Sequence, residues 1–331
     1  MAEDPQGTAA WYARAAGELA ATSELQVAWA RGVAADPAVV ALLDELPREH
    51  RQPSLIFSVA HLLGAPAAPW EEWRAWLLAE WPRVAGLARE RRTQTNEPGR
   101  CAPLLVALDR IPGPLALIEV GASAGLCLVP DRYAYRFGDA VVGDGAPELS
   151  CRVTGAGQLP QSLPDIAWRA GVDLAPLDVR DEQDAAWLEV LLPPDRPDRL
   201  ERLREAIDRV ADDPPHLVAG DALTELPALA AAAPEGATRV VVSLGTAVYL
   251  PPADRERLPA LARELGARLV TFEPVAAVPG VPERLAELTA PEPTPFVLAL
   301  DGIPLAHGSA HGESLSFLTA AGQPGEEAAR A

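Results

Sequence analysis

The sequence is poor in positive charge. Lys and Arg together number 28 in a chain of 331 residues, whereas Asp and Glu number 47, and the formal net charge is −19. A field of this sign repels phosphate backbones and anionic membrane surfaces, so neither nucleic acid nor a membrane is expected as a partner. The excess of acid needs no explanation beyond solubility.

Cysteine and long apolar runs are also scarce. The three cysteines, Cys101, Cys127 and Cys151, form no Cys-x-x-Cys pair, which argues against a disulfide framework and favours a reducing compartment. No segment approaches the roughly 18 uninterrupted apolar residues of a membrane helix. The amino terminus has no basic region followed by an apolar run. These absences predict a cytoplasmic protein.

Residues 1–112 are predicted to form an all-helical region. From Gly7 to about Arg92, alanine-rich stretches carry apolar residues at spacings of three and four, which predicts four or five helices. No strand is expected before residue 113. Asp36 followed by Pro37 is a helix start signal, because the carboxylate caps free amides and proline needs no donor there. Such a region would act as a lid or a substrate cap.

Four tryptophans fall on the last of these predicted helices. They are Trp70, Trp73, Trp76 and Trp81. Their spacing leaves most of them on one face of the helix. This favours packing against a neighbouring element over stacking on a ligand.

The pattern changes after Pro112-Gly113-Pro114. Short apolar runs alternate with helical segments, as in βαβ units with a parallel sheet. Residues 113–319 are therefore predicted to form a Rossmann-like α/β domain with a mostly parallel sheet flanked by helices. The predicted strands are Leu115–Val120, His216–Gly220, Arg239–Ser243, Arg268–Glu273, Phe296–Leu300 and Ser314–Leu318, and a helix is expected over Asp198–Val210.

Two stretches depart from this alternation. Residues 132–172 are rich in Gly, Pro and Ser, and Tyr133, Tyr135 and Phe137 alternate as in a half-buried strand. A strand plus an inserted hairpin is expected there. Residues 320–331 are small and charged, and they are predicted to form a flexible tail.

The most informative motif follows the first predicted strand, at Glu119-Val120-Gly121-Ala122-Ser123-Ala124-Gly125. A buried strand that ends in Gly-x-Ser-x-Gly and enters a helix serves two kinds of chemistry. In a cofactor site, the glycines let the backbone approach a ligand, and the amides of the helix start attract its negative end. Glu119 would accept hydrogen bonds from ligand hydroxyls or an ammonium. In a serine hydrolase, Ser123 would be the nucleophile of a strained elbow.

The position of the turn decides between these alternatives. Glu273 and His311 follow Ser123 in the order that a hydrolase triad requires. A nucleophile elbow normally follows several strands, however, and this turn follows the first, which favours the cofactor. The nicotinamide fingerprint Gly-x-Gly-x-x-Gly is absent, since position 126 is Leu, so a dehydrogenase is not expected. A tight turn that binds nothing is a further alternative.

Later predicted strands also end in polar residues. Asp221, Ser243 and Glu273 lie at or just beyond such ends. In a doubly wound sheet, ligands bind outside the carboxyl ends of the strands. These three side chains are therefore expected beside the ligand.

Four strings of residues resemble one known family. They are Gln94-Thr95-Asn96-Glu97-Pro98-Gly99-Arg100-Cys101, Pro114 to Leu126, Gly171 to Asp178, and Gly220-Asp221-Ala222. On these strings the chain is identified as a member of the domain of unknown function 2332 family, over nearly its whole length. Its Gly-rich segment is similar to the first motif of S-adenosylmethionine-dependent methyltransferases, which implies a methyltransferase-type Rossmann-like sheet and S-adenosylmethionine as cofactor.

The resemblance implies roles for individual residues. The predicted cofactor-binding set near the methionine moiety consists of Glu119, Gly121, Ala122, Ser123 and Gly125. Asp221 and Ala222 would lie beside the adenine, and Ser243 at the same edge. The acid that binds the ribose is either Asp139, about twenty residues beyond the motif, or Asp173, which is preferred because Gly-Val-Asp-Leu resembles the end of a second strand. A solvated loop carboxylate is the alternative for both.

Two departures limit the comparison. Cys127 stands where the family pattern predicts Asn, so a ligand contact of that amide would be lost. The segment Ser243-Leu244-Gly245-Thr246 differs from the Asp/Asn-Pro-Pro-aromatic pattern of enzymes that methylate nucleobase amines. Methylation of nucleobase amines is therefore not expected.

Catalytic candidates are few. If the acceptor were a hydroxyl, a base could remove its proton, and His311, Glu273 and Tyr249 are the candidates. A structural role is the alternative for each. His307 and His311 are four residues apart, but the surrounding glycines predict a loop, so no metal is expected.

A polar string precedes the first predicted strand. Its side chains Gln94, Asn96, Glu97 and Arg100 could reach the cofactor or the acceptor. Alternatively, they could cap helix ends and connect the two regions. No pattern in the sequence decides between these roles.

The leading hypothesis is a methyltransferase-like protein that uses S-adenosylmethionine and acts on an unidentified small molecule. A non-catalytic cofactor-binding or regulatory protein with the same fold is the second alternative. A serine hydrolase that uses Ser123 is the third. The sequence specifies neither the methyl acceptor nor the oligomeric state.

Overall fold

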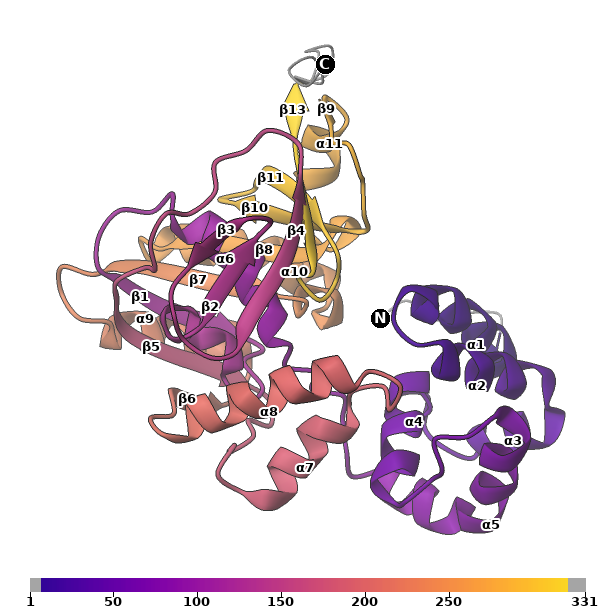
Figure 1. Cartoon of the computed structure of the whole chain (residues 1–331). Helices are drawn as coiled ribbons and strands as arrows, with labels where there is room; N and C mark the ends of the chain where they lie inside the picture. Colours follow the sequence, from indigo (N-terminus) through magenta and orange to yellow (C-terminus); the bar gives the residue numbers. More distant parts are fainter. Residues whose placement is uncertain (1–6, 321–331) are drawn as a thin grey trace. The chain divides into compact units, whose positions relative to one another are not determined.

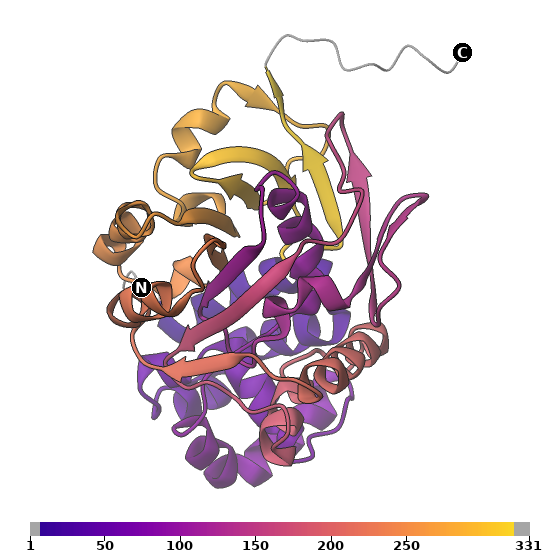
Figure 2. The same ribbon diagram turned by 90° about the vertical axis from the view of Figure 1, so that its left-hand side faces the viewer.

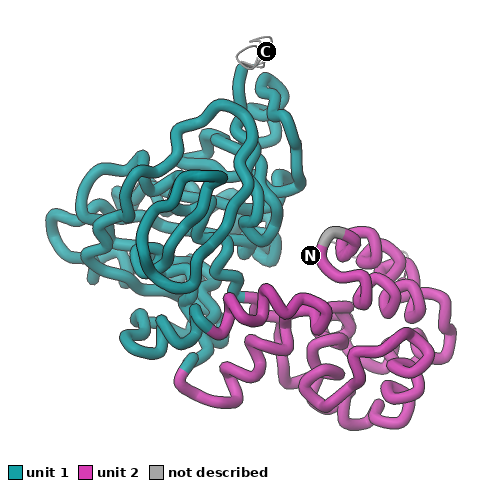
Figure 3. The backbone as a smooth tube through the Cα atoms, viewed as in Figure 1, with its two compact units in different colours: residues 1, 96–179, 205–331 teal, residues 2–95, 180–204 magenta. Residues whose placement is uncertain are grey.

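The structure, a computed structural model, describes residues 7–320 of the chain. These residues belong to two compact units, which Figure 3 shows in different colours. Among the described residues, the sheet unit consists of 96–179 and 205–320, and the helical unit of 7–95 and 180–204. The units therefore do not divide at the expected boundary of residue 112, and the helical unit includes a second, later segment.

Alanine-rich helices form the helical unit. They are α1 (Gly7–Glu18), α2 (Glu24–Ala35), α3 (Pro37–Leu43), α4 (Pro53–Leu62), α5 (Trp70–Ala88) and α7 (Glu182–Val190), with the 3-10 turns η1 (Leu19–Ala21) and η2 (Arg48–His50). Asp36 caps α3, because its carboxylate accepts hydrogen bonds from the amides of Ala38 and Val39 at 2.9 and 3.3 Å. Pro37 takes the first helical position. The predicted start signal and the five helices before residue 92 are confirmed.

Aromatic side chains form the core of the helical unit. Trp73 is fully buried and stacks on Trp29, with ring centroids 5.0 Å apart. Phe57 meets both rings edge-on, at 5.5 and 5.6 Å. Such pairs favour offset or edge-to-face geometry. The predicted packing role is confirmed for Trp73.

One large sheet organises the described part of the sheet unit (Figure 1). Its strands, in spatial order, are β3 (Ala140–Val142), β2 (Ala134–Phe137), β4 (Glu148–Thr154), β12 (Ser314–Phe317), β11 (Ile303–Gly308), β10 (Phe296–Leu300), β8 (Arg268–Pro274), β7 (Thr238–Leu244), β1 (Leu115–Val120), β5 (Ile166–Asp173) and β6 (His216–Ala219). The α-helices of this unit are α6 (Cys101–Leu108), α9 (Ala222–Ala232), α10 (Pro252–Glu264) and α11 (Val281–Leu285). The helix α8 (Pro197–Ala211) is divided between the two units at residue 204. The six predicted strands and the helix predicted over Asp198–Val210 are confirmed to within one residue at each end.

The central strands run parallel and contain a topological switch point. From β1 the chain moves to β5 and β6 on one side, and it returns to β7 and β8 on the other. β10 pairs antiparallel with β8. This is the strand order of a doubly wound sheet, whose ligands bind outside the carboxyl ends where the order reverses. The reversal falls between β1 and β7.

Helices cover both faces of these strands. Ile118, Val120 and Val241 pack with residues of α9 and α10 in one buried cluster. Every residue of α6 is buried, and α6 contacts β4, β8 and β10. Because successive side chains of a strand point to opposite faces, Glu119 projects from the face opposite to Ile118 and Val120.

Residues 132–172 differ from the expected insertion. The hairpin is present as β2 and β3, but β4 follows it and pairs in parallel with β12. Figure 2 shows β4 in magenta beside the yellow carboxyl-terminal strands. The segment therefore extends the sheet. The prediction of a loop around His307 is also wrong, because that residue lies in β11.

A flexible tail is predicted for residues 320–331, and all of these except Ala320 lie outside the described residues. Within residues 320–331, only Ala320 is described, and it pairs with Leu288 in a two-stranded sheet of β9 (Leu288–Thr289) and β13 (Thr319–Ala320). Across residues 7–320, no helix has the length and apolar character that crossing a bilayer requires.

The loop between β11 and β12 packs against the start of α6 through two glycines. A Cβ on Gly312 would lie 2.0 Å from the carbonyl oxygen of Gly99, and a Cβ on Gly99 would lie 2.3 Å from that of His311. Gly312 also has a φ of 76°, which side chains of L-residues disfavour. The two backbones can approach because neither residue carries a side chain.

We therefore predict that Gly312→Ala lowers the free energy of unfolding by about 2–4 kcal/mol, from left-handed strain together with the forced shift of the Gly99 backbone. Gly86→Ala in α5 is the matched control, because a Cβ there meets nothing within 4 Å. The control should be neutral or stabilising by up to about 1 kcal/mol. Urea denaturation measures both, and equal effects of the two substitutions would contradict the packing.

Candidate functional site

Four polar side chains of the predicted site lie at the carboxyl ends of adjacent strands. Glu119 is in β1, Asp173 ends β5, Ser243 is in β7 and Glu273 is in β8. These strands are neighbours in the order β5-β1-β7-β8, and neighbouring strands lie about 4.8 Å apart. The fold thus brings the four side chains to one edge, at the switch point.

Glu119 is a buried acid without a full set of partners. The residue is 2% exposed, and its Oε2 has no hydrogen-bond partner within residues 7–320. Burial raises the pKa of this carboxyl well above its ordinary value; Cys127 and Asp173 raise it further, and Arg100 opposes them. An unpaired polar oxygen inside a protein costs free energy, so the position is unusual.

Glu273 is equally buried, and it has a structural role in the loop that follows β7. Its Oε1 accepts hydrogen bonds from Ser243 Oγ at 2.7 Å and from the amides of Thr246 and Ala247 at 2.8 and 3.0 Å. Burial raises the pKa of Glu273, and these hydrogen bonds oppose the rise. Glu273 and Ser243 therefore hold the loop that follows β7. The second oxygen of Glu273, Oε2, has no partner among the described residues.

The turn after β1 adopts left-handed backbone conformations at three positions. The φ angles of Gly121, Ser123 and Gly125 are 73°, 50° and 75°. A Cβ on Gly121 would lie 2.3 Å from the side chain of Thr246, and one on Gly125 would lie 2.5 Å from Pro215. Side chains of this chain thus occupy the space beside both glycines.

The amides of the turn are also in use. The amides of Gly121 and Ala122 donate to the carbonyl oxygen of Val172, and the amide of Gly125 donates to that of Ala122. The amide of Ser123 donates to Asp173 Oδ2, and the amide of Leu126 donates to Asn96 Oδ1. A phosphate needs several free amides that converge on it. The turn is therefore a poor cradle for a phosphate.

The helix expected after Gly125 does not form. The chain instead makes two 3-10 turns, η4 (Leu126–Leu128) and η5 (Pro130–Arg132). Pro130 has no amide to donate to the carbonyl of Leu126, as an α-helix would require. This proline is the sequence signal that could have revealed the difference.

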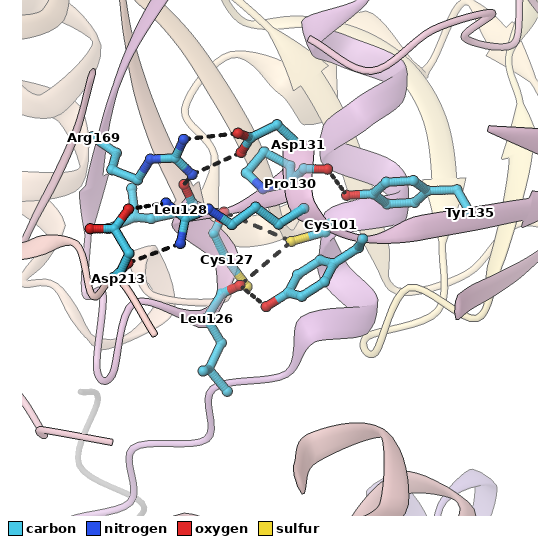
Figure 4. Close-up of polar contacts among 11 residues, drawn as sticks. Cys101, Leu126, Cys127, Leu128, Pro130, Asp131, Tyr135, Arg169 and Asp213 are labelled. Carbon is cyan, nitrogen blue, oxygen red and sulfur yellow. Dashed lines mark hydrogen bonds and ion pairs between the residues drawn. The ribbon is translucent and has the colours of Figure 1, made fainter. Parts of the chain in front are cut away.

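Side chains bind the carbonyls that a helix would have used (Figure 4). The donors are Tyr133 Oη to Leu126 O at 2.8 Å, Arg169 Nη1 to Leu128 O at 3.1 Å and Tyr135 Oη to Pro130 O at 2.6 Å. Arg169 also forms a bidentate ion pair with Asp131, at 2.8 and 2.9 Å. Such bonds compete with helical ones. No spacing in the sequence indicates this network.

Cys127, the departure from the family pattern, lies inside the same packing. It is 1% exposed, and its thiol donates to the carbonyl oxygen of Glu97 at 3.3 Å. The thiol of Cys101 lies 3.8 Å from the carbonyl oxygen of Cys127. Both cysteines are free.

The two candidate ribose acids lie in different places. Asp173 ends β5 beside the turn, and its oxygens accept the amides of Ser123 and Ala175 at 2.9 and 3.0 Å. Asp139 lies in the turn between β2 and β3, at the far end of the sheet. Of the two, Asp173 is the one at the switch point.

Asp221 caps α9. Its Oδ1 accepts the amide and the hydroxyl of Thr224, both at 3.0 Å, and Ala222 is the first residue of the helix. The amide of Gly220, one residue earlier, donates to Asp173 O at 2.9 Å. The structure therefore places Asp221 next to the end of β5.

The polar string before β1 bonds mainly within the sheet unit. Asn96 accepts the amide of Leu126 at 2.8 Å, and Glu97 Oε1 accepts that of Gly99 at 3.1 Å. Arg100 donates through Nη1 to Leu244 O at 2.6 Å and through Nε to Ala310 O at 3.0 Å. These contacts give the segment a structural role at this edge. Gln94 belongs to the helical unit.

The remaining catalytic candidates lie on loops of the same edge. The carbonyl of His311 lies over Gly99, next to Arg100. Tyr249 ends η6 (Ala247–Tyr249) and is 64% exposed. For the hydrolase alternative, Ser123 is 4% exposed and precedes a 3-10 turn, whereas a nucleophile elbow leads into a helix. That alternative remains a prediction.

A cavity lies at the opposite edge, which no motif predicted. Its volume is about 170 Å³, and its lining includes Leu105, Leu115, Leu163 and Asp165. These residues surround the amino end of β1. The cavity is therefore separate from the Glu119 edge.

A protein-family model matches residues 9–316, and its description is "Uncharacterized protein conserved in bacteria (DUF2332)". The chain belongs to this family. No curated protein and no solved structure matches the chain. The assignment to DUF2332 covers both units, and its description attaches no activity to the Glu119 edge.

The burial of Glu119 predicts a pH dependence for this DUF2332 member. Because the folded-state pKa is raised, the folded protein holds a proton that the unfolded chain has lost, and stability falls as pH rises above about 4.3, the ordinary pKa of Glu. Glu119→Gln removes the ionisable group. The melting temperature of the variant should therefore exceed that of the wild type by an amount that grows from pH 4 to pH 8.

Thermal unfolding across this pH range measures the difference. Glu256→Gln in α10, where the side chain is exposed, is the control for the same substitution outside the core. A difference for Glu119→Gln that stays constant across the pH range would contradict the raised pKa of Glu119.

Proposed function

We propose that the chain is an S-adenosylmethionine-dependent methyltransferase-like protein that acts on a small molecule. The Glu119 carboxyl carries this proposal, because it is buried, has an oxygen without a partner and lies beside the switch point. Leaving such a group unpaired costs about 1–3 kcal/mol. A ligand ammonium or hydroxyl that donates to Glu119 would offset this cost.

The turn supports a ligand without phosphate. Its amides donate within the chain, and no α-helix begins after Gly125. Phosphates and pyrophosphates bind where free amides gather at a helix start. A nucleoside joined to an amino acid needs acceptors for its ammonium and hydroxyls instead. This favours S-adenosylmethionine over a dinucleotide.

Neighbouring residues suit the rest of such a ligand. Asp173 ends β5 at this edge, and a carboxylate accepts hydrogen bonds from hydroxyls such as those of a ribose. Leu174, the next residue, is 67% exposed and offers an apolar surface to a flat base. Asp221 and Ala222 adjoin the same strand end.

When bound, S-adenosylmethionine supplies a methyl group that an acceptor nucleophile takes while the sulfur keeps the electron pair of the broken bond. The contribution of the chain is to position the reactants and exclude water. Glu273 positions the loop after β7. A hydroxyl acceptor must also lose its proton, and Glu273 is poorly suited to that task because its carboxylate holds backbone amides.

The packing beside two glycines of the turn favours a second candidate function. Thr246 and Pro215 fill the space that ligand atoms would take beside Gly121 and Gly125. In a methyltransferase-like site the glycines would face the ligand. This packing favours a non-catalytic protein that keeps the fold, as the alternative.

Calorimetric titration with S-adenosylmethionine and S-adenosylhomocysteine tests the proposal. We expect S-adenosylmethionine to bind more tightly from pH 5 to pH 8, since its positive charge favours ionised Glu119 and the raised pKa delays that ionisation. Glu119→Gln should weaken binding by roughly 10- to 100-fold at pH 8, the loss typical of a charged hydrogen bond, and should abolish the pH dependence.

Glu256→Gln is the matched control and should leave affinity unchanged. NAD serves as the phosphate-containing control ligand and should give no heat. An absence of heat from both S-adenosyl compounds would refute the proposed cofactor. Binding without turnover of any acceptor would support the non-catalytic alternative.

A further inference from the structure

The loop after β7 exposes two large apolar side chains. Val248 is 38% and Tyr249 is 64% exposed, whereas Ala247 beside them is 5% exposed. The small residue thus lies inside and the large ones outside, which is the reverse of what burial of apolar area favours. The other large apolar side chains exposed to this degree among the described residues are Val141, Leu174 and Ile303.

The backbone of this loop is well anchored. The amides of Thr246 and Ala247 donate to Glu273 at 2.8 and 3.0 Å, and the amide of Tyr249 donates to Thr246 O at 2.9 Å. Arg255 Nε donates to the carbonyl of the residue that follows Tyr249, at 3.0 Å. A held loop that keeps apolar side chains in water is typical of a binding surface.

The loop adjoins the Glu119 edge. β7 is the neighbour of β1, and the side chain of Thr246 lies so close to Gly121 that a Cβ on that glycine would come within 2.3 Å of it. A molecule resting on Tyr249 would therefore lie next to a ligand of Glu119. That is where a methyl acceptor must be.

We infer that Val248 and Tyr249 form a platform on which an uncharged aromatic ring of the methyl acceptor stacks. The inference names the acceptor class for the proposed methyl transfer and rests on that function. The tyrosine face suits a flat ring. An anionic acceptor is disfavoured here, because Arg100 uses Nε and Nη1 on the carbonyls of Ala310 and Leu244 and the loop amides are bound to the Glu273 carboxylate.

In this platform the ring of Tyr249 contacts the acceptor, and the hydroxyl of Tyr249 is not needed. Tyr249→Phe therefore keeps the binding surface, whereas Tyr249→Ala removes it. A catalytic base at this position would instead require the hydroxyl. The pair of variants separates the two roles.

The experiment is a fluorescence titration of the full chain with 2-naphthol, and with 2-naphthyl phosphate as its anionic counterpart. We expect saturable binding of 2-naphthol and at least roughly tenfold weaker binding of the phosphate. Tyr249→Ala should weaken 2-naphthol binding roughly 5- to 10-fold, the loss expected for one aromatic contact. Tyr249→Phe should bind as the wild type does.

Val141→Ala and Ile303→Ala are matched controls, since they remove equally exposed apolar side chains elsewhere on the sheet unit. Equal losses in these variants, no saturable binding of 2-naphthol, or preference for the phosphate would each overturn the platform. The outcome is independent of the cofactor titration. Binding of 2-naphthol without heat from S-adenosylmethionine would support the platform and refute the cofactor, and the reverse result would overturn the platform alone.

Discussion

The carboxyl edge of the sheet depends on hydrogen bonds from one short segment, residues 96–100. Asn96 accepts the amide of Leu126, and Arg100 donates to the carbonyls of Leu244 and Ala310. These bonds join the turn after β1, the end of β7 and the loop after β11, which are far apart in the sequence. The segment itself is fixed, because the buried helix α6 begins directly after Arg100. Bonds from a charged donor are also stronger than neutral ones.

Two acids at this edge, Glu119 and Glu273, have different environments. Both acids have an Oε2 without a partner among the described residues, but Glu273 turns its other oxygen to the hydroxyl of Ser243 and to two loop amides, which oppose the rise of its pKa. Both residues are glutamates, and both are almost fully buried. What differs is the backbone nearby, since the loop after β7 folds over Glu273. Environment can thus set two carboxyls of the same residue type apart.

Six strands and the polar residues at the ends of several of them could be predicted, because apolar runs and strand-end acids are local patterns. Asp173 lies at this edge because it ends β5, and its role toward a ribose stays a prediction. The 3-10 turns after Gly125 could not be predicted from the glycines, since they depend on Tyr133, Tyr135 and Arg169 reaching back to carbonyls. The close fit of Thr246 against Gly121 is likewise a contact between distant segments. Such contacts leave no periodicity in the sequence.

These unpredicted contacts change how a ligand could be recognised. In a doubly wound sheet with a helix after the first strand, backbone amides and the helix start bind the ligand, and they select anions. Here those amides donate to Val172, Asp173 and Asn96. The edge also holds the carboxyls of Glu119 and Asp173 and the exposed side chains of Leu174 and Tyr249. Under the proposed function, the carboxyls would accept hydroxyl and ammonium donors and the apolar side chains would contact flat rings.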